Sequence, residues 1–181
     1  TVHSNLTAEI IVLGAAFQNG IGGSRIPVSA FYRVNDGQAE RIASDAYYGG
    51  SVTVQNLAPG DTITIRGART DNGQGYESDD GTGHVWSLLR GSVVPNVAGF
   101  DGQPDIEAFV QGYIGTDGRV NIGDQSVIYL FELSGSINYQ RDSSADFQDL
   151  VVLINFSESS EGGGGGGGSS KTAAIDVRIS G

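Results

Sequence analysis

Apolar and polar side chains alternate along much of the first ninety residues, which is the pattern of half-buried β-strands. The alternation and the β-prone composition predict strands at 5–17, 26–34, 38–42, 50–57, 61–68 and 83–91. Two later segments, 126–133 and 149–156, are apolar on both faces, as expected for strands in the middle of a sheet. This spacing predicts an all-β fold, a jelly-roll-like β-sandwich of about eight to ten strands.

Turn residues separate these strands and predict how some of them are joined. Asp36-Gly37 lies between two β-prone runs and predicts a hairpin. Pro59-Gly60 suits a type II turn, and we expect it to join 50–57 and 61–68 as a second hairpin. The acidic, glycine-rich segment 69–83 is expected to be a loop.

One segment, near 104–114, has helical spacing. Pro104 suits the first turn of a helix, and Asp105 and Glu107 would lie at the positive end of the helix dipole. We expect a short helix that plugs one end of the β core.

The C-terminal part of the chain differs from the rest. Residues 158–170 form a Gly/Ser-rich linker with seven consecutive glycines, and 171–181 alternate again. Ile175, Val177 and Ile179 would share one face of a terminal strand that must be buried against a sheet. The predicted organisation is a β-sandwich domain at 1–157, the linker, and a donor-type strand at 171–181.

Composition narrows the function classes. The chain has no Cys, which excludes disulfides and thiolate chemistry, and no apolar run approaches the about 18 residues that cross a bilayer. The absence of Met agrees with a processed chain, and we expect a secreted or cell-surface protein. A net charge of −11 disfavours nucleic acid and anionic lipid as partners and favours cations.

The densest group of candidate ligands lies around the two apolar strands. Glu132 is the lone acid in its strand, and Asp142, Asp146 and Asp149 lead into the next one. A buried carboxylate must be paired or ligated, and Ca²⁺ prefers such oxygen ligands. The alternative is that these Asp side chains cap turns and stay solvated.

A second acidic group lies in the loop at 69–83. Asp71, Glu77, Asp79 and Asp80 are a second candidate cation site, and the alternative is again a solvated loop.

The segments FEL at 131–133 and ADFQDLV at 145–151 carry a resemblance to a family. The chain from about 83 to 156 resembles uncharacterised all-β domains of secreted and cell-surface bacterial proteins, which share an FEL strand followed by a D-F-N-D-L-V-type strand. Gln148 replaces the usual Asn, and Ser144 stands where an acid is common. The resemblance implies an extracellular location and a calcium ion, and no activity.

No G-x-S-x-G or H-E-x-x-H motif is present, and we expect no enzyme. The sequence favours an extracellular structural subunit that forms a homopolymer, head to tail, by donating a terminal strand to the next subunit. Either end of the chain fits that role, because 5–17 alternates as well. The alternative is a monomeric, calcium-dependent module that binds glycans, with the adjacent Tyr47 and Tyr48 on opposite faces of a strand.

Overall fold

A computed structural model describes residues 5–138 and 140–158, and this part of the chain is an all-β sandwich of nine strands, as predicted. The strands are β1 (Leu6–Gly14), β2 (Val28–Val34), β3 (Glu40–Ala43), β4 (Gly50–Leu57), β5 (Ile63–Arg69), β6 (Gly75–Glu77), β7 (Val85–Leu88), β8 (Ser126–Phe131) and β9 (Leu150–Glu158). The helical segments are α1 (Ile106–Val110) and three single 3₁₀ turns, η1 (Ala46–Tyr48), η2 (Phe100–Gly102) and η3 (Gln111–Tyr113).

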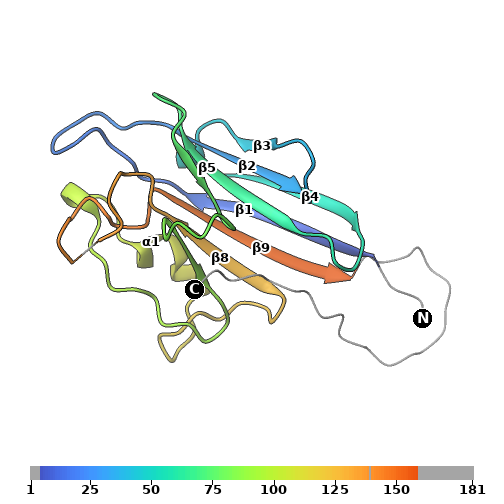
Figure 1. The fold of residues 1–181 in the computed structure, drawn as a ribbon. Coiled ribbons are helices and arrows are strands. Elements are labelled where there is room, and N and C mark those ends of the chain that lie inside the picture. The colour runs from blue at the N-terminus through green and yellow to red at the C-terminus, as the bar shows by residue number, and fades with distance from the viewer. Residues whose placement is uncertain (1–4, 139, 159–181) are drawn as a thin grey trace.

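The strands form two antiparallel sheets (Figure 1). One sheet has five strands in the order β4-β1-β9-β8-β7, and the other has four in the order β3-β2-β5-β6. The two segments that are apolar on both faces are β8 and β9, which lie side by side inside the larger sheet. Their burial follows from this position, since every residue of β8 is buried.

Two hydrophobic cores explain why β8 and β9 are apolar on both faces. The first core lies between the sheets and contains Phe131 of β8 and Leu150 of β9. The second core lies on the outer face of the larger sheet and contains Leu130 and Val151, the neighbours of these residues in sequence. Side chains one position apart on a strand point to opposite faces, so each strand contributes to both cores.

The predicted helix is present, but its position differs from the expectation. The Asp105 side chain accepts a hydrogen bond from the Ala108 amide at 3.0 Å and caps α1, which continues into η3. Ile106 and Val110 are fully buried in the second core. The helix therefore covers the outer face of the five-stranded sheet and does not plug the end of the sandwich, because that sheet has a second apolar face to bury.

One predicted hairpin is confirmed. β2 and β3 pair across the turn at Asp36-Gly37, where the Gly37 amide donates to the Val34 carbonyl at 3.0 Å.

The second predicted hairpin is wrong. The turn before Asp61 forms, with a 3.0 Å bond from the Asp61 amide to the Ala58 carbonyl and a positive φ at Gly60. However, β4 pairs with β1 and β5 pairs with β2, so the turn carries the chain from one sheet to the other. The apolar faces of β4 and β5 consequently face the same sandwich core, in which Ile65 is buried and against which Val54 packs.

Two local predictions also need correction. Gly75–Glu77 in the expected loop forms the short strand β6, which pairs with β5. Tyr47 and Tyr48 lie in the 3₁₀ turn η1 and not on a strand, and both are exposed. Asp45 caps this turn and makes a paired salt bridge with Arg25, whose guanidinium lies over the Tyr47 ring.

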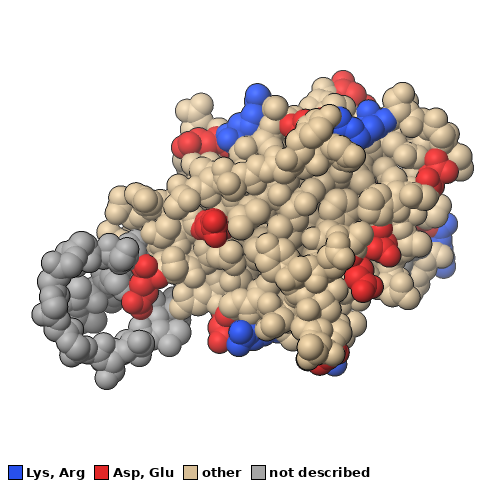
Figure 2. Space-filling model, turned by 180° about the vertical axis from the view of Figure 1, so that it is seen from behind, with Lys and Arg blue, Asp and Glu red and all other residues tan. Residues whose placement is uncertain are grey.

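Charged side chains are scattered over the face shown in Figure 2, and uncharged atoms cover most of it. Among the described residues, no helix has the length and apolar character needed to span a membrane. The linker at 158–170, apart from Glu158, and the terminal segment 171–181 lie outside the described residues.

Candidate metal centre

Three carboxylates meet where β8 ends and β9 begins. Phe131 and Leu150 are the last paired residues of the two strands, so Glu132 and Asp149 follow as the next opposed positions. Like charges directly opposite each other on paired strands are destabilising. The antiparallel register therefore produces a repulsive pair that needs a proton or a cation.

The third carboxylate, Asp146, comes from the loop that leads into β9. Phe147 has a φ of 57°, in the left-handed region that bulky residues rarely adopt, and this turns the chain between Asp146 and Gln148. The Phe147 amide donates to Glu132 Oε2 at 3.1 Å, and its ring is fully buried and stacks on Trp86 with centroids 3.7 Å apart. Strained residues of this kind cluster at functional sites.

All three carboxylates are removed from solvent. Glu132, Asp146 and Asp149 each expose no more than 1% of their surface. Four of their six oxygens accept a backbone amide hydrogen: Glu132 Oε1 from Ser134 at 2.7 Å, Glu132 Oε2 from Phe147 at 3.1 Å, Asp146 Oδ2 from Phe100 at 2.7 Å, and Asp149 Oδ2 from Leu133 at 2.6 Å. The amides fix the orientation of the carboxylates and supply partial positive charge.

Two buried oxygens of the site have no partner among the described residues. They are Asp146 Oδ1 and the side-chain carbonyl oxygen of Gln148, which is itself fully buried. The Gln148 amide nitrogen is occupied, since it donates to Asp146 Oδ2 and to Gln103 Oε1. Leaving a buried acceptor without a donor or cation costs about 1–3 kcal/mol.

Burial also changes the protonation of the site. Desolvation is the main cause that raises the pKa of Asp146 to about 6, and it raises the pKa of Asp149 well above its ordinary value. The neighbouring carboxylates act in the same direction on both groups. Within the described residues, no Lys or Arg forms an ion pair with any of the three acids.

The arrangement can hold a metal ion. One oxygen from each of Glu132, Asp146 and Asp149 lies within 4.8 Å of the others. Ca²⁺ takes oxygen ligands at about 2.3–2.6 Å, so oxygens around one ion lie up to about 5 Å apart. The spacing therefore fits a single ion bound by all three side chains.

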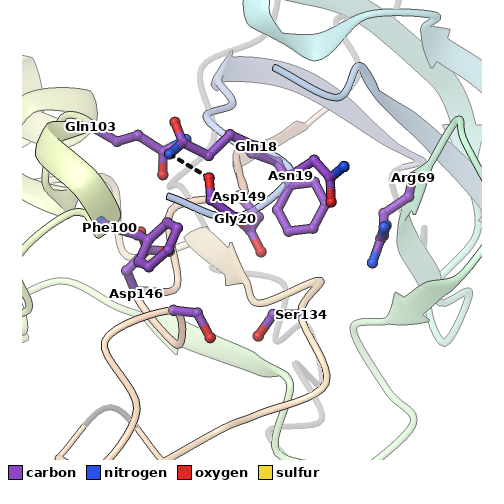
Figure 3. A pocket seen from close by; sticks show the side chains of 11 residues that line it. Gln18, Asn19, Gly20, Arg69, Phe100, Gln103, Ser134, Asp146 and Asp149 are labelled. Atoms are coloured by element: carbon purple, nitrogen blue, oxygen red, sulfur yellow. Dashed lines mark hydrogen bonds between the residues drawn. The ribbon is translucent and has the colours of Figure 1, made fainter. Parts of the chain in front are cut away.

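A pocket of about 180 Å³ adjoins this cluster (Figure 3). Its lining residues are Phe17, Gln18, Asn19, Gly20, Arg69, Phe100, Gln103, Ser134, Ser144, Asp146 and Asp149. Phe100 and Gln103 lie on one side of the view and Arg69 on the other. Two members of the acidic cluster, Asp146 and Asp149, thus also form part of the pocket wall.

The structure brings together three of the four residues in the first candidate set. Asp142 is not part of the group: its carboxylate accepts hydrogen bonds from the Ser144 amide at 3.0 Å and the Ser144 hydroxyl at 2.7 Å. Hydrogen bonds from the hydroxyl and the amide of Ser144, and from the hydroxyl of Ser136, lower the pKa of Asp142. This residue takes the turn-capping role that was the alternative for the whole set.

The second candidate set does not converge into a carboxylate group within the described residues. Asp71 is held by Arg69 at 2.7 Å, and Glu77 by Arg33 at 2.8 Å. Asp79 accepts from Thr64, and Asp80 accepts from the Thr82 hydroxyl and the Glu77 amide. These side chains stabilise the loop between β5 and β7 locally.

Ile175, Val177 and Ile179, the predicted assembly residues, lie outside the described residues. Sequence reasoning missed Gln148 as an oxygen donor and Phe100 as an amide donor to Asp146. Nothing in the local sequence marks Phe100, because it lies 46 positions from the carboxylate it contacts.

Comparisons of this chain with protein-family models, with curated proteins and with solved structures find no match.

Proposed function

We propose that this protein is an extracellular structural subunit whose β-sandwich binds calcium and which assembles into a homopolymer by strand addition. The buried trio of Glu132, Asp146 and Asp149, with an unpartnered oxygen on Asp146, carries the calcium part of the proposal. The proposal gives the protein no catalytic role.

Calcium is the ion that the ligand chemistry favours. The available donors are carboxylate and amide oxygens, whereas zinc sites usually include His or Cys. Magnesium demands near-ideal octahedral geometry at about 2.0–2.1 Å, whereas calcium accepts six to eight oxygens in a flexible geometry. A bound calcium would tie together the end of β8, the start of β9 and, through the Phe100 amide, the segment before α1.

The edge strand β4 supports the assembly part. It spans Gly50–Leu57 and pairs only with β1, at the end of the five-stranded sheet. Its sequence, GSVTVQNL, has no charged residue and no Pro, which are the usual devices that protect an edge. The other edge strands of the described fold, β3, β6 and β7, have only three or four residues.

We propose that residues 171–181 of one subunit add to β4 of the next. Their alternating sequence would give backbone bonds to the edge and place Ile175, Val177 and Ile179 on one face. A contact of this kind between different surfaces, repeated head to tail, forms a filament when it does not close into a ring.

The test is negative-stain microscopy and light scattering of the full chain, beside a chain that ends at Glu161, in calcium and in EDTA. A full-length triple variant, Ile175→Asp, Val177→Asp and Ile179→Asp, keeps the tether, and Asp176→Asn on the opposite face is its matched control. We expect filaments from the full chain and from the control only. Polymers from the truncated chain, or monomers from the full chain in calcium, would contradict strand donation by this segment.

A further inference from the structure

The pocket of about 180 Å³ shares part of its wall with the acidic cluster. Asp146 and Asp149 belong to both, and Asp146 Oδ1 is buried without a partner. An ion held by the cluster is therefore next to the space of the pocket. Calcium takes six to eight oxygens, and four of the six carboxylate oxygens already accept amide hydrogens. Oxygens from the pocket side would complete its coordination.

Apart from Arg69, the remaining walls of the pocket carry neutral polar groups and aromatic rings. Gln18, Asn19 and Gln103 contribute amides, and Ser134 and Ser144 contribute hydroxyls. The Asn19 side chain makes no hydrogen bond to another described residue. Phe100 is half-buried and presents an apolar surface at the same pocket. Such a combination of amides, hydroxyls and ring faces matches a ligand with many hydroxyls and some C–H surface.

The charges around the pocket disfavour an anionic ligand. Three carboxylates exceed the two charges of a calcium ion, and the nearby Asp101 accepts from Gln18 at 2.8 Å. Arg69 is the only cation among the lining residues, and it is occupied by Asp71 through two bonds of 3.0 and 2.7 Å. A neutral ligand avoids the resulting repulsion.

Size limits the ligand further. Pockets that hold drug-sized molecules have volumes of about 300–1,000 Å³. A space of about 180 Å³ fits one sugar ring, such as the terminal residue of a glycan.

We propose that this pocket binds a single neutral sugar ring through vicinal hydroxyls that face a calcium ion on Glu132, Asp146 and Asp149. The inference rests on the calcium binding proposed above and is separate from strand donation. It assigns Asn19 and Gln103 to the hydroxyls of the sugar and Phe100 to its C–H face.

The experiment measures saturation-transfer NMR of the calcium-loaded full chain with D-mannose, D-galactose, L-fucose and N-acetyl-D-glucosamine, followed by titration of the sugars that bind. Calcium loading is followed independently by thermal unfolding. We expect saturation transfer to at least one sugar in calcium and none in EDTA. If calcium raises the unfolding temperature but no sugar receives saturation, the sugar site is refuted and the calcium site stands. If calcium has no effect on unfolding, both proposals fail.

Two variants locate the binding. Asn19→Ala removes an exposed amide outside the metal cluster, and we expect sugar affinity to fall about five- to tenfold with the calcium response unchanged, the effect of about one hydrogen bond. Tyr48→Ala is the matched control, because the exposed Tyr47 and Tyr48 are the other aromatic surface open to a sugar. Loss of binding in Tyr48→Ala together with full binding in Asn19→Ala would overturn the assignment to the pocket.

Discussion

Asp146 offers the most direct test of the buried acidic cluster. Burial disfavours its charged form and raises its pKa to about 6 in the folded protein, against 3.8 for an exposed Asp carboxyl. Asp146→Asn keeps the shape of the side chain and removes the ionisation. Asp36→Asn, at an exposed turn position, is a control that changes the net charge equally.

The magnitude follows from proton linkage. A raised folded pKa means that the folded state binds more protons, so this stability is full below pH 3.8 and is lost as the pH rises through 6. The difference of 6 − 3.8 = 2.2 in pKa corresponds to about 3 kcal/mol in total, at 1.36 kcal/mol per unit. From the titration curves of Asp146 in the folded and the unfolded state, about 1.4 kcal/mol of this loss occurs between pH 5 and pH 7.5. Asp149, whose pKa is also raised, adds to it in the same direction.

The assay is urea unfolding in EDTA at pH 5 and pH 7.5, followed by the fluorescence of Trp86. We expect the metal-free wild type to lose at least about 1.4 kcal/mol of unfolding free energy between these pH values, and Asp146→Asn to lose about that much less. Saturating calcium should reverse the trend, because the ion binds the deprotonated carboxylates. A metal-free wild type whose pH dependence equals that of Asp146→Asn would refute the assignment of a buried, ionising Asp146.

Three further predictions concern the packing around the site. Calcium should change the fluorescence emission of Trp86, the single tryptophan, because its ring stacks on Phe147 beside the ligands. A calcium-induced rise in melting temperature with an unchanged emission spectrum would contradict this coupling. Phe147→Ala should lower the unfolding free energy by about 3–5 kcal/mol. Phe147→Gly should be about 1 kcal/mol more stable than the Ala variant, since glycine adopts the positive φ freely. If urea unfolding shows the Ala variant to be more stable than the Gly variant, the backbone strain is absent. Gly67→Ala should lower the unfolding free energy by about 1–3 kcal/mol, because the new Cβ would lie 2.8 Å from the Leu150 side chain. Gly112→Ala is the control, since its Cβ would meet open space. Equal melting temperatures for the two variants would argue against this packing.

The sequence predicts the acidic cluster well where the signal is local. Glu132 stands out as the only acid in an apolar run, and Asp146 and Asp149 precede the other central strand. Asp142 is also an aspartate that precedes this strand, yet its side chain lies in a turn closed by Ser144. Position along a loop does not determine which side chains face inward, because the left-handed turn at Phe147 sets that direction.

Predictions of long-range pairing are less successful. The turn at Pro59-Gly60 forms as its residues indicate. A turn of this kind can close a hairpin or carry the chain from one sheet to the other, and here it does the second. The choice depends on the apolar faces of β4 and β5, which pack on the same core from the two sheets. The pocket walls cannot be predicted for a similar reason, since Gln18, Arg69 and Gln103 come from three distant segments.

Glu132 and Asp149 lie opposite each other at the two ends of the segment 133–148, where this segment joins β8 and β9. An ion bound by these two residues would close the segment at its base, so that its outer part would no longer set the alignment of β8 and β9. The entropy of closing a loop grows only slowly with its length, by about 0.6 kcal/mol for each doubling. The exposed stretch around Gly135 and Ser143 is therefore where the chain can be lengthened, or can carry an inserted peptide, while the sandwich below keeps its register.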